Sequence, residues 1–132
     1  MLSARLGITC TAIAIALFAA PAFAQDSKAR KEMKRTDLSG APGMEVILSI
    51  SEYKPGDSIA LHKHHGVEAG YVLEGGKVQA GDKPATELKT GGPIMNERDV
   101  MHGGWKNVGT TTIKLVTVHV VDKGKPLYDE KK

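Results

Sequence analysis

The stretch Leu61–Gly76, LHKHHGVEAGYVLEGG, carries the strongest indication of fold and function. It holds three of the chain's five histidines within four positions, followed by Glu68 and an apolar run that ends in two glycines. Successive side chains of a β-strand point to opposite faces, so His62 and His64 share a face that Lys63 does not. Two buried imidazoles without partners would be costly. A metal ion that accepts a lone pair from each removes this cost.

Glu68 and His102 extend this candidate metal site. A short connection through residues 65–67 returns the Glu68 carboxylate to the two imidazoles, and His102 is expected at the end of another short strand. Three imidazoles and one carboxylate suit a first-row transition metal and leave one or two octahedral positions free. His65 falls on the opposite parity or in the turn, outside the site. The alternative is a chance His-x-His cluster in a surface loop.

The remainder of the chain favours an all-β fold. Short β-rich segments are punctuated by glycine and proline, and no convincing amphipathic helix interrupts them. This spacing is typical of an antiparallel sandwich or barrel. The expected strands cover residues 44–51, 58–64, 69–73, 77–80, 85–88 and 110–121.

Two groups of residues resemble the sequence motifs of the cupin superfamily. The first motif is matched in every spacing by Gly56, His62, His64, Glu68 and Gly75. The second motif is matched by Gly91 and His102, whereas Glu97 and Asp99 replace the expected proline and glycine and Asn107 lies one residue late. The segments 35–38 and 122–127 also look like those of small single-domain bacterial cupins.

The resemblance implies a cupin-type antiparallel β-barrel, also called a double-stranded β-helix or jelly roll. It implies that His62, His64, Glu68 and His102 hold one divalent transition metal ion (Fe, Mn, Ni, Cu, Co or Zn). Cupins have diverse functions, and the fold alone does not fix the reaction. Because the ligand set suits it, we expect a metal-dependent dioxygenase-type oxidoreductase acting on a small organic molecule. An isomerase using the same metal, a non-catalytic small-molecule-binding module and a purely structural metal site are the alternatives.

The N-terminal residues are expected to be processed. Residues 1–24 combine a single positive charge at Arg5, an apolar stretch and Ala22-Phe23-Ala24, which is the pattern of a secretory signal peptide. The apolar stretch is shorter than the roughly 20 residues of a membrane span. Residues 25–40 are expected to form an N-terminal arm that is polar and poorly ordered over residues 25–34, and residues 41–132 to form the cupin domain. We expect export to the periplasm or medium, without a membrane segment in the mature form.

Composition restricts the possible partners. The lone cysteine, Cys10, lies in the predicted signal, so the mature domain must fold without disulfides. The formal charge falls from +3 to +2 when Arg5 is removed, too mild a balance to suggest nucleic acid. If Glu68 faces inward, Ala69, Tyr71 and Leu73 face outward, and this apolar stripe favours a homodimer.

Three further features have two interpretations each. His119 shares parity with Ile113, Leu115 and Thr117, and either packs in the core or faces the cavity. Met95, Met101 and Trp105 either pack in the barrel or contact the ligand. Arg98 either belongs to a solvated turn or meets an acidic substrate.

Overall fold

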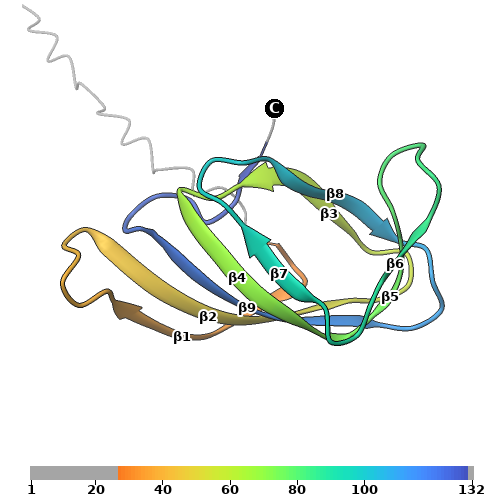
Figure 1. Cartoon of the computed structure of the whole chain (residues 1–132), viewed down its shortest axis with the longest axis horizontal. Helices are drawn as coiled ribbons and strands as arrows, with labels where there is room; N and C mark the ends of the chain where they lie inside the picture. The colour runs from red at the N-terminus through yellow and green to blue at the C-terminus, as the bar shows by residue number, and fades with distance from the viewer. Residues whose placement is uncertain (1–26, 131–132) are drawn as a thin grey trace, which may run out of the picture.

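The computed structural model describes residues 27–130, and these fold into two facing antiparallel β-sheets (Figure 1). The first sheet has the order β1-β2-β9-β4-β7 and the second the order β10-β3-β8-β5-β6. The strands are β1 (Arg30–Asp37), β2 (Met44–Tyr53), β3 (Ser58–Lys63), β4 (Gly66–Glu74), β5 (Gly76–Gln79), β6 (Thr86–Leu88), β7 (Pro93–Asn96), β8 (His102–Asn107), β9 (Ile113–Asp122) and β10 (Asp129–Glu130). The prediction of an all-β antiparallel fold is confirmed.

The two longest strands, β2 and β9, form the centre of the first sheet. They pair over ten residues each, from Met44 opposite Asp122 to Tyr53 opposite Ile113. In β9 every second side chain is buried, beginning with Ile113, as expected of a sheet with one face on the core. The apolar core, formed by Tyr53, Val72, Ile113 and Leu115, lies at one end of the space between the sheets. The space beyond it is left for polar groups.

Strand β1 corrects the expectation that residues 25–34 are poorly ordered, because the strand begins at Arg30. Residues 30–37 pair along β2 with one irregularity between Glu32 and Lys34. Their polar side chains match the buried polar groups of β2. Arg35 donates to the buried carboxylate of Glu45 at 2.8 Å, and Arg30 donates to the buried hydroxyl of Ser49 at 2.6 Å. A charged strand is stable here because it supplies partners for buried acceptors of its neighbour.

Asn107 ties the ends of several strands together. Its side-chain amide donates to the carbonyls of Tyr53 and Thr111 at 2.9 and 2.8 Å, and its side-chain oxygen accepts from the Gly109 amide at 3.0 Å. The residue is buried, and its bond to the Tyr53 carbonyl is fully shielded from water. Asn107 therefore braces the turn between β8 and β9, although it lies one residue late for the second motif.

The predicted signal peptide, residues 1–24, lies outside the described residues. Within residues 27–130, no helix is long and apolar enough to cross a membrane.

Candidate metal centre

Five residues from five structural segments meet between the sheets. His62 is on β3, His64 on the turn that follows it, Glu68 on β4, His102 at the start of β8 and His119 on β9. All except His102 are buried. His102 was expected at the end of a strand; it opens β8 instead, where it pairs with His62 across the sheet. The four residues predicted as ligands therefore do come together.

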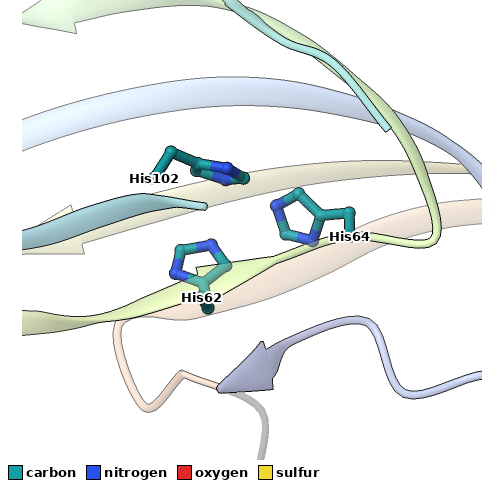
Figure 2. Close-up of side chains that lie close together, drawn as sticks. All are labelled: His62, His64 and His102. Atoms are coloured by element: carbon teal, nitrogen blue, oxygen red, sulfur yellow. The ribbon is translucent and has the colours of Figure 1, made fainter. Parts of the chain in front are cut away.

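The rings of His62, His64 and His102 face a common space (Figure 2). Their centroids lie 4.4 to 4.8 Å apart, with the planes tilted by 50 to 68°. Each offers one nitrogen within 4.8 Å of the others, and His64, Glu68 and His119 form a second such group. Metal–ligand bonds in proteins are about 2.0–2.2 Å long. Ligand atoms at these spacings can converge on a single ion.

Backbone carbonyls fix which nitrogen of each ring is available. The Nδ1 atoms of the three rings lie within hydrogen-bonding distance of the carbonyls of Ala60, Leu127 and Val100, in the order His62, His64 and His102. A carbonyl only accepts, so each Nδ1 carries the hydrogen and each Nε2 keeps a lone pair. This arrangement is typical of metal-bound histidines, whose second nitrogen donates to a carbonyl or carboxylate.

Glu68 is held by the strands on either side of it. In the sheet it lies opposite Asn96 of β7 and opposite His119 of β9. The Asn96 amide donates to Glu68 Oε2 at 2.6 Å. The same oxygen lies 3.4 Å from His64 Nε2 and 3.3 Å from His102 Nε2. Oε2 therefore points into the space shared by the histidine rings.

His119, for which the sequence left core packing and the cavity as alternatives, lies in the interior beside Glu68 and does not line the cavity. Its ring is fully buried, and its Nε2 lies 3.4 Å from Glu68 Oε1, the oxygen turned away from His102. Strand parity placed His119 with Ile113, Leu115 and Thr117 but did not say which face was inside. The ring can add a fifth ligand or hold the Glu68 carboxylate in place.

Several buried nitrogens have no hydrogen-bond partner among residues 27–130. They are Nε2 of His64, Nε2 of His102 and both ring nitrogens of His119. Buried polar groups are rarely left unsatisfied, and each such group calls for an unseen partner. A cluster of lone pairs beside a carboxylate favours a cation. The donor set of imidazole nitrogen and carboxylate oxygen fits a divalent transition metal.

Burial and the shared carboxylate shift the pKa values of these groups in different directions. Burial lowers the pKa of His62 to about 4 and also lowers that of His119. Burial opposes the His102 cation as well, but Glu68 and the Val100 carbonyl outweigh it and raise the His102 pKa. Burial would raise the pKa of Glu68, yet the imidazoles of His102, His119 and His64 that face the carboxylate lower it well below its usual range. Glu68 is thus ionised and His62 neutral near pH 7.

A cavity of about 320 Å³ adjoins the cluster. Glu68, His62 and His102 line it, whereas His64 and His119 lie behind them. Tyr128, from the C-terminal segment, also lines it and packs its ring 4.6 Å from that of His62. No sequence pattern indicated Tyr128. It reaches the site because β10 pairs with β3, placing Asp129 opposite Lys63.

Two residues considered for the site lie outside it. His65 faces Asp99 and Asp129, at 3.4 and 3.5 Å from its two ring nitrogens. Arg98 makes two hydrogen bonds of 2.9 Å with Asp122 and does not line the cavity. Of the three residues expected near the mouth, Met95 and Trp105 line the cavity and Met101 does not.

The low pKa of His62 predicts that the metal-free protein loses stability in acid. The unfolded His62 binds a proton below about pH 6.5, whereas the folded one does so only near 4. The unfolded state therefore binds more protons between these values, so the free energy of unfolding falls as pH falls. At pH 5 the loss is about 2 kcal/mol for this residue.

Urea unfolding of metal-stripped protein at pH 7.5 and 5 measures this loss. The variant His62→Gln is the control, because it retains the opposing contribution of the raised His102 pKa and lacks only the His62 titration. We expect the variant to lose less stability between the two pH values than wild type. Parallel losses would show that His62 titrates normally in the folded protein.

Comparison with known proteins agrees with this geometry. Three solved structures share the fold: a double-stranded β-helix protein from Klebsiella pneumoniae (20% identity, 83% of this chain and 92% of that one, TM-score 0.57), the polyketide cyclase RemF from Streptomyces resistomycificus (21%, 70% and 74%, 0.52) and a cupin 2 conserved barrel domain protein from Rhodopseudomonas palustris (13%, 79% and 77%, 0.50). Among curated proteins, none matches this chain. The cupin domain family matches residues 49–119, more than half of the chain, and the protein therefore belongs to the cupin family.

Proposed function

We propose that this cupin is a metal-dependent oxidoreductase of the dioxygenase type that acts on a small organic molecule. The observation that carries the proposal is the position of the cluster at the wall of a cavity. Glu68, His62 and His102 belong to the cluster and also line the cavity. A structural metal site is usually closed by its protein ligands, whereas a catalytic one keeps a position free for water or substrate.

His62, His64, His102 and Glu68 would hold the ion. A redox-active divalent ion held by these residues would supply the redox chemistry for oxidation of an organic substrate by oxygen. The chain's own residues prepare this site. The Nδ1 contacts to backbone carbonyls direct each Nε2 inward, and Asn96 directs Glu68 Oε2. Tyr128 and the strand segment around it cover the His62 and His64 rings.

An isomerase is the second candidate, and Tyr128 and His119 are the observation in its favour. An isomerase needs groups that move protons beside the metal-bound substrate. Tyr128 lines the cavity, and His119 contacts Glu68 from behind. A binding module that turns nothing over would use the same cavity. Consumption of oxygen separates the first function from the other two.

We also propose that the protein forms a homodimer through the outer face of the first sheet. Cross-strand rows of apolar side chains run across this face, for example from Leu48 through Val118 to Ala69. The exposed fractions of Tyr71 and Leu73 are 48% and 41%. A charged row of Glu52, Lys114 and Glu74 borders the apolar rows. A flat face with an apolar centre and a charged rim can pair with itself about a two-fold axis.

The metal proposal predicts which variants lose the ion. We expect His62→Ala, His64→Ala, Glu68→Ala and His102→Ala to weaken metal binding by more than about 100-fold, the upper end of the loss seen for outer-shell partners. Asn96→Ala should weaken it by roughly 10- to 100-fold, because it only orients Glu68. Titration of stripped protein with Zn²⁺ against a chromophoric chelator measures these affinities. The matched control is His65→Ala, which should bind as wild type; loss of the metal in that variant would contradict the assignment.

The oxygenase proposal predicts metal-dependent oxygen uptake. Protein reconstituted separately with Fe, Mn, Ni, Cu, Co and Zn is assayed with flavonols, catechols, β-diketones and keto acids in an oxygen electrode. We expect uptake with a redox-active metal and at least one of these substrates, and none in the His102→Ala variant. Uptake that survives in that variant would be adventitious. No uptake with any metal, together with tight binding of a substrate, would favour the binding module.

The dimer proposal predicts a change of mass on a double substitution. Tyr71→Asp combined with Leu73→Asp places two charges on the apolar face, and we expect monomers in light scattering at micromolar concentration. The matched control replaces two exposed apolar residues elsewhere, Leu61→Asp combined with Val108→Asp, and should leave the dimer intact. A wild-type protein that is already monomeric would refute the proposal.

A further inference from the structure

We propose that the cavity selects a molecule that binds the metal through its own oxygen atoms and carries an uncharged, ring-sized apolar body. This inference rests on the proposed function of the metal centre and adds the class of substrate. It follows from the charges, the shape and the size of the cavity wall.

The cavity wall offers no side chain to neutralise a second negative charge. Among residues 27–130, none of those lining the cavity is lysine or arginine. Its ionisable groups are His62, His102 and Glu68 of the metal centre and the phenols of Tyr53 and Tyr128. The other polar side chains, Ser51, Thr117, Asn96 and the indole of Trp105, are neutral. An anionic group on the body of a ligand would thus be buried without a cationic partner, which is unfavourable.

Three basic residues that could have served the site are engaged elsewhere. Arg98, which stands in the loop before His102, is fixed by Asp122 on the outside of the barrel. Lys63 points away from His62 and His64 and lies 3.7 Å from both Asp99 and Asp129. Arg30 enters the barrel interior but donates to Ser49 and lies 3.6 Å from Glu32. The expectation that Arg98 would favour an anionic substrate is therefore not supported.

The remaining wall is apolar and partly aromatic. Ile59, Leu88, Ile94 and Leu115 line it together with Tyr53 and Trp105. The last two rings pack edge to face, with centroids 4.8 Å apart. A volume of about 320 Å³ is at the low end of the range for ligand pockets. The wall suits a single planar ring, whose edge can meet the aromatic faces.

Trp105 provides a readout that does not depend on activity. It is the only tryptophan of the chain and lines the cavity, so its fluorescence reports occupancy. Zn²⁺-loaded protein, which is redox-silent, is titrated anaerobically with catechol and with 3,4-dihydroxybenzoate. Both probes present the same two hydroxyls to the metal, and only the second carries a carboxylate on its ring. We expect catechol to bind at least about tenfold more tightly.

A single charge placed in the wall should reverse this preference. Leu88→Lys puts an ammonium beside the cavity from a half-buried position at the end of β6, and we expect it to tighten 3,4-dihydroxybenzoate relative to catechol by about tenfold. Ile94→Lys serves as the second variant if the first does not fold, as judged by circular dichroism. Val108→Lys, outside the cavity, is the matched control and should leave the ratio unchanged.

The outcomes separate this inference from the metal proposal. Equal or tighter binding of 3,4-dihydroxybenzoate by wild-type protein would overturn the inference, as would the failure of both probes to bind. The zinc content of each sample is measured in parallel. If zinc is not retained, or if catechol binds the stripped protein equally well, the metal proposal fails, whereas the ratio of the two probes still tests the charge of the wall.

Discussion

The buried carboxylate of Glu68 is the group around which the interior of this barrel is arranged. One of its oxygens faces His64 and His102 and accepts a hydrogen bond from Asn96, and the other faces His119. A carboxylate without such neighbours would be too costly to bury. The imidazoles have the complementary requirement, because their lone pairs point into a space without other partners. The imidazoles lower the cost of burying the carboxylate, and the carboxylate lowers the cost of burying the imidazoles. A cation would satisfy both.

This arrangement also fixes the register of β4. Because side chains alternate along a strand, a slip by one residue would turn Glu68 out of the barrel and move Ala69 into it. The register that places Glu68 opposite Asn96 and His119 also directs Tyr71 and Leu73 to the outer face. The polar interior and the apolar exterior of the first sheet are therefore two consequences of one alignment. The apolar outer face is the surface on which the proposed homodimer would form.

The two ends of the cavity differ in chemistry. At one end His62, His102 and Glu68 supply ligands for an ion, and their pKa values keep Glu68 ionised and His62 neutral near pH 7. At the other end Trp105 and its apolar neighbours supply shape without charge. Where the wall carries no charge, the binding energy of a ligand must come from the apolar surface it buries and from its fit to the cavity. This favours an organic substrate that brings its own metal-binding oxygen atoms.

Much of the centre could be predicted from sequence because it is local. His62 and His64 lie two residues apart, at the end of β3 and directly after it, and Glu68 follows after a short turn. Strand parity and chain reach therefore suffice to bring them together. His102 is far away in sequence and was placed by its position in a motif. The same parity argument separated His65 from its neighbours. The strands rich in β-branched residues, above all β9, could also be predicted, because their composition is a local property of the sequence.

Tertiary structure decided what depends on contacts between distant segments. Parity grouped His119 with Ile113 and Leu115, but only the packing of two sheets determines which face of β9 is inside. Tyr128 enters the site because two residues of β10 pair with β3, too short a signal to detect in sequence. Arg98 turned to Asp122 rather than to the cavity, since the two residues meet only in the folded barrel. Strand β1 was not predicted because its sequence is highly charged. The buried acceptors that stabilise it belong to β2, its neighbour in the sheet.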